Sequence, residues 1–249
     1  MRLKDQVAIV TGAASGFGAE IARRYIAEGA SVVAADLNEV GVRALAAELG
    51  ERAHPMRCDV TNGADVAALA AATVQRYRKL DIVVNNAGWS YRNSPLLELS
   101  EDDFDKVIAV NVKSIYLMVR STVPLLRANK RGCIINIGSV SGIRPRPGLV
   151  WYAASKAAVN FVSKAMAAEL GPDNIRVNAV APVMSPTGLI EQFMGMPDTP
   201  ENRNRFLGNI PLGRLATPLD IAKACVYLAS DDADFITGVE LPVDGGRAV

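Results

Sequence analysis

The segment Thr11-Gly12-Ala13-Ala14-Ser15-Gly16-Phe17-Gly18 follows an apolar run, Val7–Val10, and leads into a stretch with helical spacing, Phe17–Glu28. Glycine permits a tight turn and close approach of another backbone or a ligand. Free N–H groups at a helix N-terminus attract phosphate oxygens. The alternative is a plain strand-to-helix turn. Because the glycines lie between a strand and a helix at the start of the chain, the sequence predicts a pyrophosphate-binding loop.

The rest of the chain repeats this alternation of apolar runs and amphipathic stretches. Continuous apolar strands between helices indicate a parallel sheet that is covered on both faces. No linker, repeat or low-complexity segment divides residues 1–249, so we expect a single-domain, doubly wound α/β Rossmann fold with about seven parallel strands. The expected strands are Val7–Val10, Ser31–Ala35, Ala53–Cys58, Ile82–Val84, Cys133–Ile137, Ile175–Val180 and Val239–Val243. The expected helices are Phe17–Glu28, Glu39–Leu49, Ala64–Tyr77, Phe104–Arg127, Trp151–Leu170 and Thr217–Ala229.

Composition excludes several classes of function. The net charge is +1 with the charges scattered, so no basic stripe for nucleic acid is expected. No apolar run reaches the roughly 18 residues that span a bilayer, and the N-terminus lacks the pattern of a signal peptide. With one histidine and three separated cysteines, Cys58, Cys133 and Cys225, no metal site is expected. Buried free thiols favour a cytoplasmic protein.

Residues 183–213 form the one long segment without clear periodicity. The segment is rich in proline, glycine and methionine. Long irregular segments in compact domains are usually functional lids or disordered insertions. We expect a flap that covers the substrate, with a plain surface insertion as the alternative.

Asp36 ends the second expected strand, 24 residues after Gly12. At that distance a carboxylate can accept hydrogen bonds from the ribose of an adenosine. The alternative is a helix N-cap, because Asp36–Glu39 fits a capping-box pattern. A carboxylate repels a 2′-phosphate, and neither Ser15 nor Leu37 is an Arg or Lys that would attract one. The sequence therefore predicts NAD rather than NADP.

Tyr152 and Lys156 are four residues apart on an expected helix and so share one face. A phenol beside an ammonium is a plausible acid/base pair, since a nearby cation favours the phenolate. Ser139, at the end of an expected strand, could supply a hydroxyl to the same point.

Together these segments resemble the short-chain dehydrogenase/reductase family over essentially the whole chain. The matches are Thr11–Gly18 with T-G-x-x-x-G-x-G, Asp59-Val60 after the third strand, Asn85–Gly88 with N-N-A-G, Asn111 on a helix, Ser139, and Tyr152–Lys156 with Y-x-x-x-K. The ending Thr237–Gly246 resembles the bacterial branch of 3-oxoacyl-carrier-protein reductases and polyol or cyclic-alcohol dehydrogenases.

The resemblance implies a role for each motif. Tyr152 is expected to be the general acid/base, Lys156 to bind the nicotinamide ribose and help Tyr152 ionise, Ser139 to donate to the substrate oxygen, and Asn111 to organise a water linked to Lys156. The residues expected to bind the dinucleotide are Gly12, Ser15, Gly16, Phe17, Gly18, Asp36, Leu37, Asp59, Val60, Asn86, Ala87, Gly88, Tyr152, Lys156, Pro182, Ser185 and Thr187. Family habit also implies a homotetramer.

One position departs from the family pattern. Members commonly have Pro-Gly after the sixth strand, whereas this chain has Pro182-Val183. Valine is β-branched and does not easily adopt positive φ. The departure puts in question the backbone path and the contact expected from Thr187.

The substrate side is less constrained by the sequence. The resemblance places Trp89, Ser141, Arg144, Trp151 and Met184 near the substrate. An arginine such as Arg144 or Arg146 could clamp an anionic group, or could be solvated or lie at a subunit contact. The sequence predicts an NAD-dependent dehydrogenase or reductase of a secondary alcohol or ketone. The alternatives are an NADP-dependent 3-oxoacyl thioester reductase and a non-catalytic dinucleotide-binding sensor, and the intact Ser139, Tyr152, Lys156 and Asn111 argue against the sensor.

Overall fold

A seven-stranded parallel sheet forms the centre of the protein in a computed structural model that describes residues 1–249. The strand order is β3-β2-β1-β4-β5-β6-β7, and every neighbouring pair is parallel. The strands are β1 (Val7–Thr11), β2 (Ser31–Asp36), β3 (Ala53–Arg57), β4 (Ile82–Asn85), β5 (Gly132–Ile137), β6 (Ile175–Pro182) and β7 (Glu240–Val243). The expected doubly wound sheet is confirmed, with strand ends within two residues of those expected.

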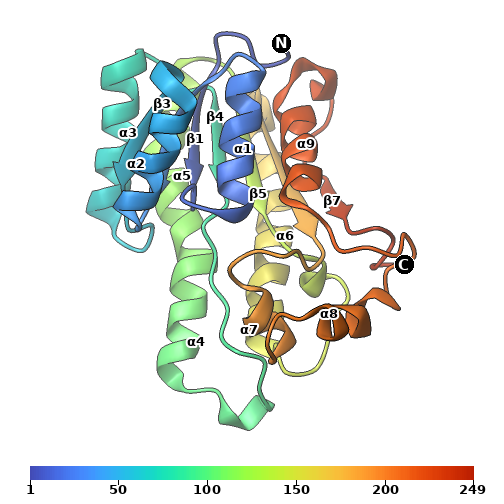
Figure 1. Cartoon of the computed structure of the whole chain (residues 1–249). Helices are drawn as coiled ribbons and strands as arrows, with labels where there is room; N and C mark the ends of the chain where they lie inside the picture. The colour runs from blue at the N-terminus through green and yellow to red at the C-terminus, as the bar shows by residue number, and fades with distance from the viewer.

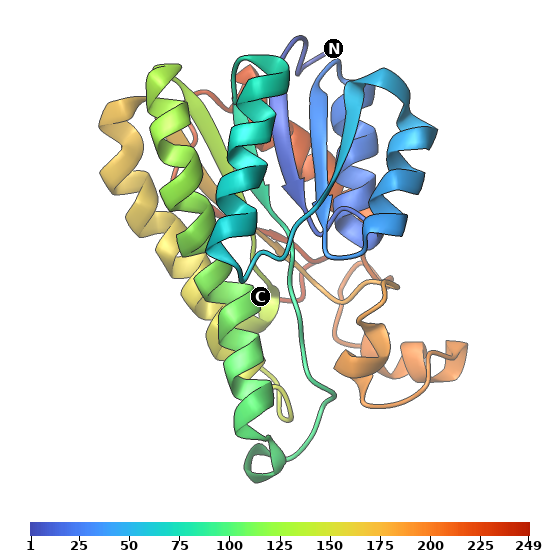
Figure 2. The ribbon, with the colours of Figure 1, turned by 90° about the vertical axis from the view of Figure 1, so that its left-hand side faces the viewer.

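Helices cover both faces of the sheet (Figures 1 and 2). One face carries α1 (Gly16–Ala27), α2 (Glu39–Leu49) and α9 (Pro218–Ala229), and the other carries α3 (Gly63–Tyr77), α5 (Ser114–Ala128) and α6 (Val150–Leu170). Alternate strand residues divide between two cores. Ala8 and Val10 pack with α1 and α9, whereas Ile9 packs with α3, α5 and α6. Such two-sided burial explains why the central strands β1 and β4 are mostly apolar.

The strand order reverses at β1, which pairs with β2 on one side and β4 on the other. Connections from these strands leave to opposite faces of the sheet, which opens a crevice at their carboxyl ends. The glycine-rich segment follows β1, and Asn86 follows β4. The topology thus brings the first two motifs together.

The expected helix Phe104–Arg127 is not continuous. It consists of α4 (Glu101–Ile108), a π-helical turn at Ala109–Lys113 and α5. The π-helical turn contains the buried Asn111. Single π-helical turns inside helices often mark functional sites, and no pattern in the sequence indicated this one.

The segment 183–213 is not wholly irregular, so that part of the expectation is wrong. It contains two short helices, α7 (Ile190–Met194) and α8 (Pro200–Leu207). Figure 1 shows both helices beyond the carboxyl ends of the strands. Thr199 caps α8 by accepting from the N–H of Asn202 at 3.2 Å, and Pro200 occupies its first turn.

The three cysteines are buried and free. None of the helices combines the length and the hydrophobicity needed to cross a membrane.

Candidate active site

Gly12, Gly16 and Gly18 form a cradle between β1 and α1. Gly12 and Gly16 have φ values of 65° and 56°, a region that side chains disfavour. A Cβ at Gly12 would lie 2.8 Å from the Asn86 amide nitrogen, and one at Gly18 would lie 2.2 Å from the Gly12 carbonyl oxygen. The side-chain amide of Asn86 donates to the carbonyls of Thr11 at 2.8 Å and Gly12 at 3.2 Å. The glycines are therefore needed for close backbone packing as well as for an open N-terminus of α1.

Asp36 lies beside this cradle at the end of β2. Its carboxylate accepts from the N–H of Ala14 at 2.9 Å and from the N–H of Asn38 at 2.9 Å. The N-cap of α2 is Asn38, whose side chain accepts from the N–H of Gly41 at 3.0 Å. The N-cap interpretation of Asp36 is therefore wrong, and Asp36 instead ties the glycine loop to β2.

Asp59 follows β3 in a bonded turn. Its carboxylate accepts from the backbone N–H of Thr61 at 2.9 Å and from the Thr61 hydroxyl at 2.7 Å. These hydrogen bonds lower the pKa of Asp59 and fix its orientation. Val60 is buried in the core beside α3, whereas Leu37 is 59 % exposed.

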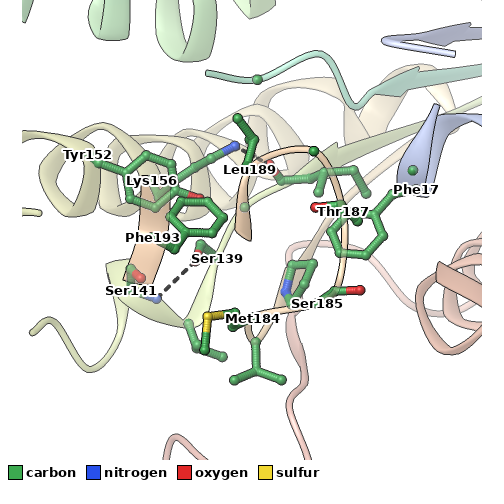
Figure 3. A pocket seen from close by; sticks show the side chains of 18 of the residues that line it. Phe17, Ser139, Ser141, Tyr152, Lys156, Met184, Ser185, Thr187, Leu189 and Phe193 are labelled. Atoms are coloured by element: carbon green, nitrogen blue, oxygen red, sulfur yellow. Dashed lines mark hydrogen bonds between the residues drawn. The ribbon is translucent and has the colours of Figure 1, made fainter. Parts of the chain in front are cut away.

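Ser139, Tyr152 and Lys156 meet where β5 ends and α6 begins, and all three side chains are buried. Figure 3 shows Ser139, Tyr152 and Phe193 grouped on one side of the pocket. The Lys156 ammonium donates to the Ile137 carbonyl at 2.7 Å, and the Ser139 hydroxyl accepts from the N–H of Ser141 at 3.1 Å. Two separate segments thus place a phenol, an ammonium and a hydroxyl on one wall.

Burial shifts the pKa values of both titratable groups of this trio toward their neutral forms. It raises the pKa of Tyr152 to about 12, while the Ser139 hydroxyl and the positive charge of Arg146 act in the opposite direction. It lowers the pKa of Lys156 to about 8. Below that pH Lys156 remains a buried cation with no carboxylate partner, and Tyr152 is a protonated acid.

Asn111 anchors the loop after β4. Its Oδ1 accepts from the N–H of Trp89 at 2.8 Å, and its Nδ2 donates to the Trp89 carbonyl and to the Ser155 hydroxyl, both at 3.0 Å. An amide oxygen has two lone pairs, so Oδ1 keeps one acceptor site. A Cβ at Gly88 would lie 3.5 Å from this oxygen and 3.4 Å from the Lys156 nitrogen. A side chain there would touch both atoms, so glycine leaves the most room beside them.

A cavity of about 560 Å³ joins the cradle to the Ser139–Tyr152–Lys156 wall. Most of the expected site residues line it. These are Gly12, Ser15, Gly16, Phe17, Asp36, Asn86, Ala87, Gly88, Trp89, Ser139, Ser141, Arg144, Tyr152, Lys156, Pro182, Met184, Ser185 and Thr187. Segments from β1, β2, β4, β5, α6 and β6 therefore converge on one space.

Six expected site residues lie outside the lining of this cavity: Gly18, Leu37, Asp59, Val60, Asn111 and Trp151. For Trp151 this corrects the expected position near the substrate. Successive helical residues are about 100° apart, so the Trp151 side chain leaves α6 in a different direction from that of Tyr152. Its ring packs edge-on against Phe104 with centroids 5.2 Å apart.

Other residues that line the cavity were not among the expected site residues. They are Arg146, Leu189, Phe193, Arg205, Phe206, Asn209, Ile210 and Arg247. Arg247 reaches the cavity because the C-terminal turn packs on the segment 183–213. A Cβ at Gly245 would lie 2.8 Å from Ile210, and the N–H of Leu212 donates to the Gly245 carbonyl at 3.0 Å. Such long-range packing leaves no local sequence signal.

Val183 fits without backbone strain. It is absent from the residues with positive φ, it is buried in the core beside α1 and α9, and its N–H donates to the Val243 carbonyl. The strand simply continues through Pro182, so no glycine is needed. Thr187 still reaches the cradle, since a Cβ at Gly16 would lie 3.4 Å from its methyl carbon.

The residues present fit a dinucleotide. Gly12 and Gly16, which have no side chain, line the cavity at the N-terminus of α1, where a pyrophosphate needs close access to backbone N–H groups. The buried Ser185 hydroxyl, on the cavity wall, has no hydrogen-bond partner within the protein. A buried polar group without a partner costs free energy unless a bound group satisfies it.

Comparison with known proteins agrees with this geometry. Residues 12–248 match the family model described as enoyl-(acyl carrier protein) reductase. The chain is 50 % identical over 252 residues to the 4-formylbenzenesulfonate dehydrogenase of Comamonas testosteroni, with all of both chains covered. It is 37 % identical to a cyclopentanol dehydrogenase of Comamonas sp., with 98 % of each chain covered. It also resembles the crystal structure of a 3-ketoacyl-(acyl-carrier-protein) reductase from Brucella melitensis complexed with NADH, at a TM-score of 0.94 and 40 % identity over 99 % of this chain and 100 % of that one.

Proposed function

The chain belongs to the short-chain dehydrogenase/reductase family of oxidoreductases, and from that premise we propose that it transfers a hydride between NAD(H) and a secondary alcohol or ketone. The observation that carries the proposal is the joint position of Ser139, Tyr152 and Lys156 on the cavity that the glycine cradle opens into. Relatives named for cyclopentanol and for 4-formylbenzenesulfonate support a compact substrate that contains a ring.

Tyr152 is the general acid/base in this proposal. With its pKa at about 12 it is a protonated donor at neutral pH and delivers its proton to a carbonyl oxygen as charge develops there. In the alcohol-oxidising direction it must accept a proton, for which the nearby cations stabilise the phenolate. Ser139 donates a hydrogen bond to the same oxygen, which stabilises the charged form.

Lys156 supplies a fixed positive charge beside the reacting oxygen and holds the nicotinamide ribose. Its single bond within the protein, to the Ile137 carbonyl, leaves two N–H donors for these contacts. Asn111 fixes the Trp89 backbone and retains an acceptor site for a water that exchanges protons with Lys156.

The dinucleotide, when bound, supplies the hydride. Gly12, Ser15, Gly16 and Phe17 hold the pyrophosphate at the N-terminus of α1, and Asp36 and Leu37 hold the adenosine ribose. Asp59 and Val60 contact the adenine. Asn86, Ala87 and Gly88, together with Pro182, Ser185 and Thr187, enclose the nicotinamide half. Gly18 keeps α1 close to the cradle.

The preference for NAD rests on Asp36. A carboxylate at this position accepts from ribose hydroxyls and repels a 2′-phosphate. This argues against an NADP-dependent 3-oxoacyl thioester reductase, although such reductases are among the relatives, including one from Thermotoga maritima at 38 % identity. A dinucleotide-binding sensor would have no use for a converging phenol, ammonium and hydroxyl.

We also propose that residues 1–249 act as one domain, with 183–213 as a flap over the substrate, in a cytoplasmic homotetramer. Exposed aromatic side chains on α5 and α6, Tyr116 at 55 % and Phe161 at 71 %, support contacts between subunits.

The test is a panel of cyclic alcohols, aromatic alcohols and ketones, polyols and a 3-oxoacyl thioester, each offered with NAD(H) and NADP(H). Absorbance of the reduced cofactor reports turnover. We expect NAD-linked turnover of at least one alcohol–ketone pair by the native protein and none by Tyr152→Phe. Turnover confined to NADP and the thioester would establish the alternative, and cofactor binding without turnover of any substrate would favour the sensor.

A further inference from the structure

Positive charge is concentrated on one part of the cavity wall. Four arginines line the cavity: Arg144, Arg146, Arg205 and Arg247. The only carboxylate in the lining is Asp36, which lies three strands away from β5 in the sheet order. The chain as a whole has a net charge of only +1, so this cluster does not follow from an overall excess of basic residues.

Arg146, Arg205 and Arg247 have no salt-bridge partner. The guanidinium of Arg144 donates to the Arg247 carbonyl at 3.0 Å and to the main-chain oxygen of the terminal residue Val249 at 2.7 Å, which is a structural role. Arg146 donates to the Phe193 carbonyl and lies 5.1 Å from the ring centroid of Phe206. These contacts leave most of the N–H donors of Arg146 free, since a guanidinium carries five.

Arg247 has an unfilled donor. Its Nη1 is buried and has no hydrogen-bond partner in the protein, although the residue lines the cavity. An unsatisfied buried donor costs free energy, and a charged one costs more. Burial and the charge of Arg144 lower the pKa of Arg247, although the charge of Asp244 acts in the opposite direction, and burial and the charge of Arg247 lower the pKa of Arg146. An anion between these arginines would relieve both the missing hydrogen bond and the mutual repulsion.

Phe193 connects Tyr152 with this cluster of arginines. The rings of Tyr152 and Phe193 have centroids 5.1 Å apart, and the Phe193 carbonyl is the one that accepts from Arg146. Figure 3 shows Phe193, Leu189 and Met184 around the same space. The cavity therefore brings together a proton donor at Tyr152, apolar side chains at Met184, Leu189 and Phe193, and the arginines without salt-bridge partners.

We propose that Arg146 and Arg247 bind an anionic group, a sulfonate or a carboxylate, on the far side of a ring-containing alcohol or ketone substrate. The inference rests on the proposed function for the position of the reacting oxygen at Tyr152. Binding of the pyrophosphate does not account for the cluster. The pyrophosphate is expected at the glycine cradle, which follows β1, whereas Arg146 is close enough to Tyr152 for its positive charge to lower the pKa of that phenol. Arg144 positions the C-terminal turn, and exposed Arg205 borders the site.

A binding experiment tests the anion site without any turnover. Calorimetry compares the binding of 4-methylbenzenesulfonate with that of its uncharged counterpart 4-methylbenzenesulfonamide, each titrated into the full-length protein with NAD present. A second pair, 4-methylbenzoate and the uncharged 4-methylbenzamide, tests a carboxylate in the same way. We expect at least one anion to bind more tightly than its neutral counterpart by on the order of 10- to 100-fold, as charged hydrogen bonds predict. Equal affinities within both pairs would overturn the proposal.

Substitution of individual arginines tests which residues cause the preference for the anionic ligand. Arg146→Met and Arg247→Met are each expected to reduce the anion-to-neutral affinity ratio by on the order of tenfold or more. Arg146→Lys is expected to restore part of it, because the charge returns without the planar donors. The matched control is Arg43→Gln, an exposed arginine on α2 outside the cavity, which should keep the native ratio. Thermal unfolding checks that each variant is folded, and a native ratio in both folded Met variants would contradict the assignment.

A kinetic arm separates this inference from the proposed function. Native protein with NADH is offered 4-acetylbenzenesulfonate and 4-acetylbenzenesulfonamide. One outcome is turnover of both ketones with equal kcat/KM, together with equal calorimetric affinities for the anionic and neutral ligands. That outcome would support the oxidoreductase function and overturn the anion site. Anion-selective binding without turnover of any alcohol or ketone in the wider panel would support the anion site and overturn the proposed reaction.

Discussion

Gly142 lies against α6 so closely that a Cβ added to it would stand 2.6 Å from the backbone nitrogen of Ala157. The turn that begins at Ser139 is thereby pressed onto the helix that carries Tyr152 and Lys156. The Asn160 side chain adds a bond from α6 to the Ser139 carbonyl at 3.2 Å. The relative position of the hydroxyl and the phenol is therefore set by backbone packing.

Gly142→Ala should separate this turn from α6. The inserted methyl group meets backbone atoms, which cannot rotate away, so overpacking should cost about 1–3 kcal/mol of stability. Displacement of Ser139 by a fraction of an ångström should lower kcat by on the order of 10- to 100-fold. Gly171→Ala is the matched control, because Gly171 has no atom within 4 Å of its Cβ position and a helical φ of −53°. Steady-state kinetics and urea unfolding measure kcat and stability for both variants. A native kcat in Gly142→Ala would contradict the role of this packing in positioning Ser139.

Tyr152→Phe should remove the proton donor and little else. Only the hydroxyl is lost, and the ring keeps its contact with Phe193. Loss of a general acid/base typically costs 10²–10⁴-fold, so kcat should fall by about that factor. NADH affinity, followed by fluorescence, should change by less than about threefold, since most of the proposed dinucleotide contacts lie elsewhere. Native turnover would refute the role of Tyr152, and lost NADH binding would show a structural defect instead.

The strands and the glycine cradle were predictable from sequence because they depend on local patterns. The central strands β1 and β4 are apolar runs buried on two faces, and Gly12 and Gly16 occupy a turn that only glycine adopts easily. The alternative role of Asp36 as the N-cap of α2 was wrong because Asn38, two residues later, is an equally good N-cap and takes that position. Thr199 followed by Pro200 is a local signal for the start of α8 that hydrophobic periodicity does not contain.

The far side of the cavity was not predictable in the same way. Arg247 reaches the site through packing of the C-terminal turn on Ile210, and no spacing in the sequence encodes that contact. Trp151 was misplaced because a resemblance locates a segment but not the direction of each side chain on it. The π-helical turn likewise contains Asn111, which hydrogen-bonds to Trp89 and Ser155, residues distant in the sequence.

Asp36→Ala should reduce the preference for NAD over NADP. The mutation removes the negative charge that repels a 2′-phosphate, and kcat/KM with NAD should fall by on the order of 10- to 100-fold as ribose hydrogen bonds are lost. Because Asp36 also accepts from the N–H of Ala14, Asp36→Asn serves as the control that keeps an acceptor but not the charge. Kinetics with both cofactors measure the ratio. If both variants retain the native selectivity, Asp36 serves only to hold the glycine loop.

Lys156→Met should change how stability depends on pH. The pKa of Lys156 is lowered to about 8 in the folded protein, whereas an unfolded lysine titrates near 10.4. Between these values the folded state loses its proton first, the unfolded state binds more protons, and stability rises with pH. The native protein should therefore gain about 2 kcal/mol relative to Lys156→Met between about pH 7 and pH 9.5.

Urea unfolding of the native and Lys156→Met proteins without cofactor, at both ends of this range, measures the gain. Contributions from groups that titrate alike in the two proteins cancel in the difference. Tyr152, with its pKa at about 12, keeps its proton throughout the range in the folded state. If the stability difference between the two proteins stays constant with pH, burial does not lower the pKa of Lys156, and the ammonium must be stabilised by a partner that the cavity does not show.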